Sequence, residues 1–195
     1  IDFPDKELDK KVRAQINKPM GNLYLKDLLK VKYIHSYYWE PISNISGLEY
    51  CTNITELILE GTNLVDIRPI NKLKKLLSIQ LNNNSIIDLS PLNNLPYLHT
   101  ANLTGNSIST LSFVKGLPSL QYLYLGNNRI NDLTNINELK NLLVLHLNLN
   151  NISDISPIKD LKFLSKLYIL DNNISDLSPL NGMSSLKEID FSANP

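Results

Sequence analysis

The sequence predicts an α/β solenoid, in which short units of one strand and one turn stack along a single axis. Three observations predict this fold. An apolar pattern recurs every 22 residues without insertion or deletion, each repeat opens with alternating apolar and polar residues, and an asparagine follows each alternation. One such unit cannot bury its apolar face alone, so we expect neighbouring units to stack around a continuous core.

Seven units share one set of positions. Their first positions are Ile54, Leu76, Leu98, Leu120, Leu142, Leu164 and Leu186. The stretch "LSKLYILDNNISDLSPLNGM" shows the pattern in full, L-x-x-L-x-L-x-x-N-x-I-x-D-L-S-P-L-x-x-L, which is that of a leucine-rich repeat. In each "L-x-L" the leucines point inward and their neighbours point outward. Stacked units therefore predict one parallel sheet.

The asparagines that follow the strands are expected to be structural. They are Asn84, Asn106, Asn128, Asn150, Asn172 and Asn194. The chain turns inward at these positions, where an amide side chain can satisfy backbone groups that would otherwise be buried without partners. Asn148, two residues before Asn150, is expected to face solvent on the concave side.

The phrase "SDLSPL" predicts a short helical turn on the convex side. Ser178 suits an N-cap and Pro179 the first residue of that turn. The aspartates of this position form a file of Asp66, Asp88, Asp132, Asp154 and Asp176. Stacked carboxylates could bind cations, or each could accept hydrogen bonds from the local backbone. Thr110 interrupts the file and no Asp-Gly calcium loop surrounds it, which favours the backbone interpretation.

The first 41 residues do not follow the repeat and predict a helical cap. In "FPDKELDKKVRAQI", Leu8, Val12 and Ile16 share one face of a helix that Asp5 could cap. A second, short helix is expected from a group of apolar residues, Leu25, Leu28, Leu29 and Val31. Such a cap would cover the core of the first unit.

The array itself is expected over residues 42–195. In its first, degenerate unit a cysteine, Cys51, stands where later units have leucine, which indicates a buried thiol rather than a nucleophile. The final unit ends just after its asparagine, at Pro195, with nothing to cover it. We therefore expect the array to be truncated at this end and to continue in the natural protein.

Two stretches carry a resemblance to a known family. The cap phrase "FPDKELDKKVRAQINKPMGN" and "GLEYCTNITELIL" leading into the repeats resemble the bacterial internalin-like proteins, which have 22-residue SDS22-type repeats and an N-terminal helical cap. The resemblance implies a right-handed superhelix with a concave parallel sheet and short 3-10 turns on its convex face. It also implies a secreted or cell-surface module that binds a protein ligand, such as a host or cell-surface protein. Ala101, Thr110 and Phe113 depart from the pattern, so we expect a locally adjusted core in their unit.

Other functional classes receive little support. The 19 basic and 19 acidic side chains balance, which disfavours nucleic acid as a partner, and no apolar run is long enough to insert into a membrane. The sequence holds no catalytic motif, and its three histidines, His35, His99 and His146, lack metal-ligand spacing. We therefore expect no enzyme, no cofactor and no metal. Two alternatives stay open: a cytoplasmic SDS22-like regulatory subunit, and a targeting array attached to a larger enzyme.

The outward positions of the strands predict a binding site. One column reads Ile34, Glu56, Ser78, Thr100, Tyr122, Val144, Lys166 and Glu188, and the next reads Ser36, Ile58, Gln80, Asn102, Tyr124, His146, Tyr168 and Asp190. From Tyr122 onward this face becomes aromatic and apolar, although it points away from the core. Tyrosines also simply suit strands, but tyrosine-rich patches are typical of protein-binding surfaces.

The predicted partner-binding residues are Tyr122, Tyr124, Val144, His146, Leu149, Lys166, Tyr168 and Leu170. The three tyrosines and His146 form the expected centre, and Lys166 a charged rim. A second exposed group, Tyr38 and Trp39, is expected at the cap end of the same face.

Overall fold

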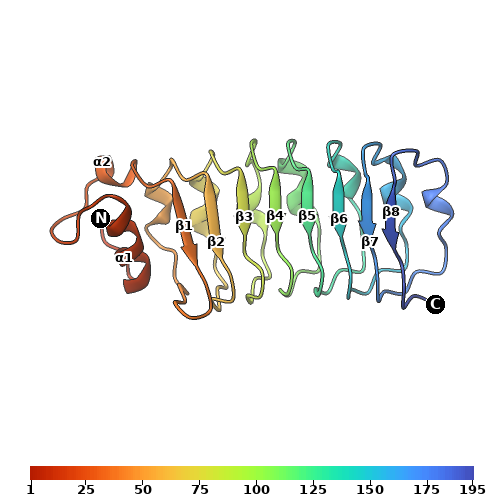
Figure 1. Ribbon diagram of the computed structural model, residues 1–195, viewed down its shortest axis with the longest axis horizontal. Coiled ribbons are helices and arrows are strands. Elements are labelled where there is room, and N and C mark those ends of the chain that lie inside the picture. The colour runs from red at the N-terminus through yellow and green to blue at the C-terminus, as the bar shows by residue number, and fades with distance from the viewer.

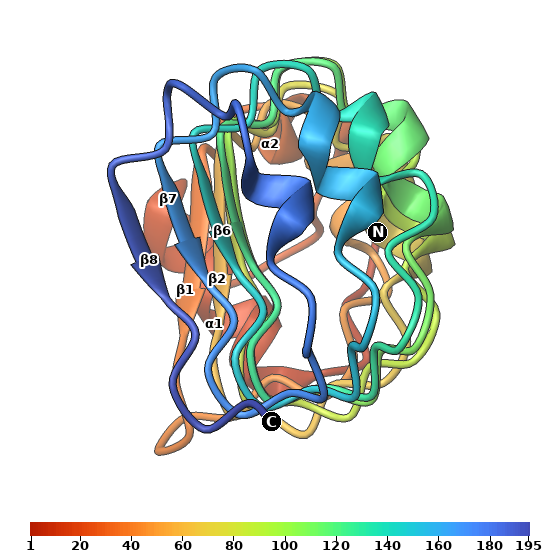
Figure 2. The same ribbon diagram turned by 90° about the vertical axis from the view of Figure 1, so that its right-hand side faces the viewer.

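Eight parallel strands lie side by side in chain order in the computed structural model, which describes all residues from 1 to 195 (Figure 1). The strands are β1 (Tyr33–Ser36), β2 (Glu56–Leu59), β3 (Ser78–Gln80), β4 (Thr100–Asn102), β5 (Tyr122–Tyr124), β6 (Val144–His146), β7 (Lys166–Tyr168) and β8 (Glu188–Asp190). Seen along the stack, the sheet forms one side of the molecule and the helical turns form the other (Figure 2). The predicted leucine-rich-repeat solenoid is confirmed.

Seven 3-10 turns line the convex side. They are Leu48–Tyr50, Arg68–Lys72, Ser90–Leu92, Ser112–Gly116, Ile136–Glu138, Ser156–Asp160 and Ser178–Leu180. The aspartate before most of these turns accepts a backbone hydrogen bond, as Asp154 does from the N–H of Ser156 at 2.7 Å. The backbone interpretation of the aspartate file is thus confirmed. The N-cap prediction is wrong, because Ser178 is the first residue of its turn and donates its hydroxyl to Asp176 at 2.9 Å.

One continuous core runs through all the units. The leucines of the strand positions, such as Leu142, Leu145 and Leu147, are fully buried. The unit that departs from the pattern combines a small core residue, Ala101, with the largest fully buried side chain, Phe113. The core therefore adjusts locally by redistributing volume, which keeps its packing dense.

The helical cap covers the first unit. Helix α1 (Lys6–Gln15) begins where Asp5 accepts hydrogen bonds from the N–H groups of Glu7 and Leu8, and it buries Leu8 and Val12 against the core. Helix α2 (Leu25–Leu28) is also present, and Leu28 is its only buried apolar residue, beside the buried Asp27. Leu25 is 52% exposed and Leu29 39% exposed, so the second predicted helix contributes less to the core than expected.

The register of β1 differs from the prediction. Tyr33 pairs with Glu56 and His35 with Ile58, whereas Ile34 and Ser36 were expected to face outward. Ile34 is instead buried in the core, and the buried Ser36 donates its hydroxyl to the carbonyl of Glu40. The loop after β1 holds one residue more than its equivalents, so an expectation based on uniform spacing shifts this strand by one position and to the wrong face.

The asparagines after the strands form a ladder of hydrogen bonds inside the turn. Asn150 donates its amide to the carbonyls of Leu125 and Leu147, each at 3.0 Å. Its Oδ1 accepts the N–H of Ile130 at 2.9 Å. The same pattern recurs at Asn106, Asn128, Asn172 and Asn194, and Asn84 forms it with Leu59, Leu81 and Leu64. The predicted structural role is confirmed, and we call this array the asparagine ladder.

Asn148 is less free than expected. Its Oδ1 accepts the backbone N–H of Leu170 at 2.9 Å, and its side chain is half-buried. The side chain is still partly open to solvent, but its amide also connects the segments that follow β6 and β7, which the sequence did not indicate. Asn148 is unsuitable as a neutral control for the ladder.

Replacement of Asn150 by alanine should destabilise the protein by about 1–3 kcal/mol, because it leaves buried backbone groups without partners. The neighbouring Asn151 is exposed and its side chain forms no hydrogen bond with the protein, so Asn151→Ala should cost under about 0.5 kcal/mol. Urea unfolding of both variants measures the difference. Equal losses would contradict the structural role of the ladder.

Hydrogen exchange should be fastest from Leu186 onward and slowest in the central units. Leu186 and Ile189 are only partly buried and Phe191 is 48% exposed, because one neighbouring unit covers them instead of two. Mass-spectrometric exchange on this chain measures the gradient. Protection that is uniform through Asn194 would show that the last unit is as stable as the middle ones.

Candidate functional site

The outward side chains of β5, β6 and β7 form two rows across the concave sheet. Strand pairing aligns Tyr122, Val144 and Lys166 in one row. It aligns Tyr124, His146 and Tyr168 in the other. Lys166 is exposed and the other five are half-buried, and none belongs to the core. The predicted centre of the site is therefore assembled from three successive units.

The second row is a continuous stack of rings, which we call the aromatic strip. The ring centroids of Tyr124 and His146 lie 4.7 Å apart with a tilt of 33°. Those of His146 and Tyr168 lie 4.0 Å apart at 19°, which is a stacked arrangement. Contacts of this kind favour one side-chain orientation, so the strip presents a defined surface before any partner arrives.

Glu188, on β8, anchors one end of the strip. The Tyr168 hydroxyl donates a hydrogen bond to its carboxylate, and the Lys166 Nζ lies 2.6 Å from the same group. These two hydrogen bonds lower the pKa of Glu188, and the bond to Glu188 raises the pKa of Tyr168. At neutral pH, Glu188 is therefore charged and Tyr168 is protonated, so the hydrogen bond between them is maintained.

His146 is neutral in this setting. Partial burial between the two tyrosines lowers its pKa below the ordinary value of 6.5, against the opposing effect of the Glu188 charge. At pH 7 the imidazole therefore adds no charge to the middle of the strip. The centre of the site is apolar and aromatic, and its charges lie at one end.

Leu149 lies beside this surface in a backbone conformation that leucine rarely adopts. Its φ is +57°, in the left-handed region, and its side chain is 47% exposed. The equivalent residues of the other units are Gly61, Asn83, Gly105, Asn127, Asp171 and Ala193, all with positive φ. Glycine and asparagine tolerate this conformation, whereas other L-residues lose about 1–2 kcal/mol in it. The fold gives no reason for an exposed leucine here.

Leu170 is the backbone neighbour of Leu149. The N–H of Leu149 donates to the carbonyl of Leu170 at 2.9 Å, and the Leu170 side chain is half-buried. The eight predicted residues thus all belong to the outward face or the adjoining edge of the units that contain β5, β6 and β7. Sequence reasoning missed the anchoring role of Glu188 and the backbone strain at Leu149. The glycines and asparagines at the equivalent positions were the available signal for the strain.

The second predicted group lies at the opposite end of the sheet. Tyr38 is 72% exposed and Trp39 61% exposed, in the loop that follows β1. The Trp39 ring stacks on Tyr37 at 4.9 Å and meets Tyr38 edge-on at 4.6 Å. Three units separate this loop from the aromatic strip, so the two groups are distinct surfaces.

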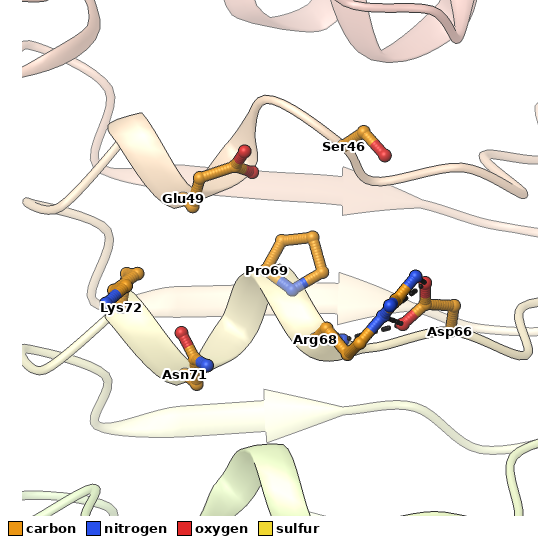
Figure 3. A pocket seen from close by; sticks show the side chains of 7 residues that line it. All are labelled: Ser46, Glu49, Asp66, Arg68, Pro69, Asn71 and Lys72. Atoms are coloured by element: carbon orange, nitrogen blue, oxygen red, sulfur yellow. Dashed lines mark hydrogen bonds and ion pairs between the residues drawn. The ribbon is translucent and has the colours of Figure 1, made fainter.

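The convex side carries a polar hollow but no reactive group. Ser46, Glu49, Asp66, Arg68, Pro69, Asn71 and Lys72 line it (Figure 3). Its most prominent interaction is internal, since Arg68 binds the Asp66 carboxylate at 2.6 Å.

No group of three or more His, Cys, Asp or Glu side chains is placed to hold a metal ion. Burial raises the pKa of Cys51 to about 12, which makes that thiol a poor nucleophile. None of the helices has the length and apolar content to cross a membrane.

Comparison with known proteins begins with the repeats. Residues 96–138 match the family model described as leucine-rich repeats in two copies. Comparison with curated protein sequences gave no match. Proteins of this fold are typically protein-interaction modules without enzymatic activity.

Solved structures resemble the chain over nearly its whole length. Internalin C2 from Listeria monocytogenes is 30% identical with a TM-score of 0.76, and the match covers 97% of this chain and 94% of that one. An internalin, InlF, from the same species is 29% identical with a TM-score of 0.70, over 98% and 70% of the two chains.

A third similar structure comes from a plant. The leucine-rich-repeat ectodomain of the membrane receptor kinase GASSHO1 from Arabidopsis thaliana, in complex with CASPARIAN STRIP INTEGRITY FACTOR 2, is 25% identical with a TM-score of 0.68. That match covers 76% of this chain and 19% of the plant chain. The near-complete match to internalin C2, together with the repeat pattern, shows that the chain belongs to the internalin family of leucine-rich-repeat proteins.

Proposed function

We propose that this chain is a non-enzymatic module that binds a partner protein through the concave face. The binding surface consists of Tyr122, Tyr124, Val144, His146, Leu149, Lys166, Tyr168 and Leu170. The observation that carries the proposal is the aromatic strip, which lies outside the core and has its rings already stacked. A tyrosine-rich, apolar centre with charges at one side is the composition of protein-binding hot spots.

Leu149 provides a second, independent observation in favour of this binding surface. A residue kept in an unfavourable backbone conformation while exposing an apolar side chain costs stability without serving the fold. Such strain is characteristic of functional positions. A partner that buries this side chain would give it the apolar environment that the free chain lacks.

The proposed location is the surface of a bacterium or the medium outside it. Membership of the internalin family supports this location. The partner is then a protein of a host or of another cell surface. Its recognition would depend on apolar contact along the strip, with orientation set by Lys166, Glu188 and the charges of the partner.

The double replacement Tyr124→Ser with Tyr168→Ser tests the site. Partner affinity should fall at least about tenfold, because the stacked rings are lost, and the melting temperature should stay within a few degrees because neither side chain is in the core. Affinity is measured by surface plasmon resonance on a partner validated with the unaltered chain.

A matched control removes two aromatic side chains elsewhere. Tyr97 and Phe163 are each 58% exposed and lie in turns that precede β4 and β7. The variant Tyr97→Ser with Phe163→Ser should bind as the unaltered chain does. Unchanged affinity of the Tyr124 and Tyr168 variant, or an equal loss in the control, would remove the proposed site.

Leu149→Asn should change stability and binding in opposite directions. Asparagine occupies the same position at Asn83 and Asn127, so the free energy of unfolding should rise by about 1 kcal/mol. Partner affinity should fall by roughly tenfold, about 1.4 kcal/mol. Urea unfolding and surface plasmon resonance measure the two effects. A loss of stability would show that Leu149 serves the fold, and unchanged affinity would place it outside the interface.

A further inference from the structure

The outward side chains of β3 and β4 differ from those of the rest of the sheet. Strand pairing aligns Ser78 with Thr100 and Gln80 with Asn102. All four are half-buried, and each is a hydroxyl or an amide without charge. They form a compact block of neutral hydrogen-bonding groups, which we call the neutral block.

A buried amide beside the neutral block lacks a partner. Asn82 is 8% exposed, and its Oδ1 accepts no hydrogen bond. At the equivalent position three units later, the Oδ1 of Asn148 accepts the N–H of Leu170 from the next unit. For Asn82 the matching donor is the N–H of Thr104, but Asn102 already accepts that hydrogen at 3.2 Å.

The Asn148 pair indicates which donor would serve Asn82 if Asn102 changed partners. If the Asn102 side chain turns toward a ligand, the N–H of Thr104 can pass to the vacant Oδ1 of Asn82. No backbone donor then loses its hydrogen bond, and a buried acceptor gains one. Asn102 can therefore bind a ligand without the usual penalty for leaving a buried group unpaired.

Exposed aromatic rings adjoin the same part of the sheet. Tyr37, Tyr38 and Trp39 contact one another in the loop after β1, which extends past the edge of the sheet (Figure 2). The loop is held by Lys11, whose Nζ lies 2.7 Å from Glu40. Trp39 is 61% exposed and does not belong to the core, so its ring is available for contact.

Two contacts connect the loop after β1 to the strand end beside the neutral block. The Tyr38 Cβ lies 3.2 Å from the position that a side chain on Gly61 would occupy. The N–H of Gly61 in turn donates to the carbonyl of Asn82 at 3.0 Å. The loop, the end of β2 and the end of β3 are thus successive neighbours, and Asn102 lies one strand further, on β4. The distance from the loop to β4 is three strand spacings, about 14 Å.

We propose that this surface binds a neutral oligosaccharide. The exposed face of Trp39 would stack against the carbon–hydrogen face of one sugar ring. The hydroxyls and amides of the neutral block, with Asn102 released, would exchange hydrogen bonds with the hydroxyls of the rings further along the same oligosaccharide, since both sides can donate and accept. The block contains no cation for a phosphate backbone. Asn102 pairs with Tyr124 on the next strand, so the block borders the aromatic strip, but the sugar site as proposed uses no residue of the strip.

Fluorescence of Trp39, the only tryptophan in the chain, gives a direct test. The unaltered chain is titrated with maltotriose, triacetylchitotriose and lactose as neutral probes. We expect a saturable change in emission with at least one probe, at a dissociation constant on the order of 1 mM. Asn102→Ala should weaken that affinity at least about tenfold. Asn82→Ala should weaken it as well, although Asn82 does not touch the sugar, because it removes the alternative acceptor.

The control is Tyr168→Ser, three strands away from Asn102, which should leave sugar affinity unchanged and so separates this site from the proposed protein interface. The absence of saturable change with every probe would overturn the proposal. Equal sugar affinity in the Asn102 variant and the unaltered chain would also overturn it. A change in Trp39 emission with a protein partner alone, and with no sugar, would assign the surface to a protein interface instead.

Discussion

The asparagine ladder is the interaction on which the rest of the structure depends. Each unit must turn inward after its strand, which brings backbone carbonyls into an apolar core. The carbonyl of Leu125 receives no backbone N–H, but it accepts the amides of both Asn128 and Asn150, each at 3.0 Å. The carbonyls of Leu103 and Leu147 are shared in the same way by successive asparagines. The ladder therefore gives the backbone carbonyls of each turn their hydrogen-bond donors, and it also connects neighbouring units.

The outward residues of the strands are not needed to specify the fold. Core leucines, turn aspartates and ladder asparagines specify the solenoid, so side chains on the concave face can vary without loss of the fold. The chain uses that freedom unevenly. Units around β3 and β4 present neutral amides and hydroxyls, whereas units from β5 to β7 present stacked rings. In the proposed interface, the strained Leu149 would be a position where a surface requirement outweighs a backbone preference.

The sequence predicted the regular part of the fold because periodicity encodes it. The register of seven strands, the buried Cys51 and the cap on Asp5 all follow from local pattern. The register of β1 could not be predicted, since one additional loop residue interrupts the spacing that the prediction used. The aromatic residues of the concave face were identified from the outward columns. Their stacking, the anchor at Glu188 and the unpaired Asn82 depend on side-chain conformation between units, which the pattern of one unit does not contain.

A double-mutant cycle on Asn128→Ala and Asn150→Ala tests the central role of the ladder most directly. Either single change leaves the Leu125 carbonyl with one amide donor, and the double change leaves it with none. The free energy of unfolding, measured in urea, should therefore fall in the double variant by about 1 kcal/mol more than the sum of the single losses. The distant pair Asn84→Ala and Asn172→Ala should be additive within about 0.5 kcal/mol. Additivity at Asn128 and Asn150 would contradict a ladder that couples neighbouring units.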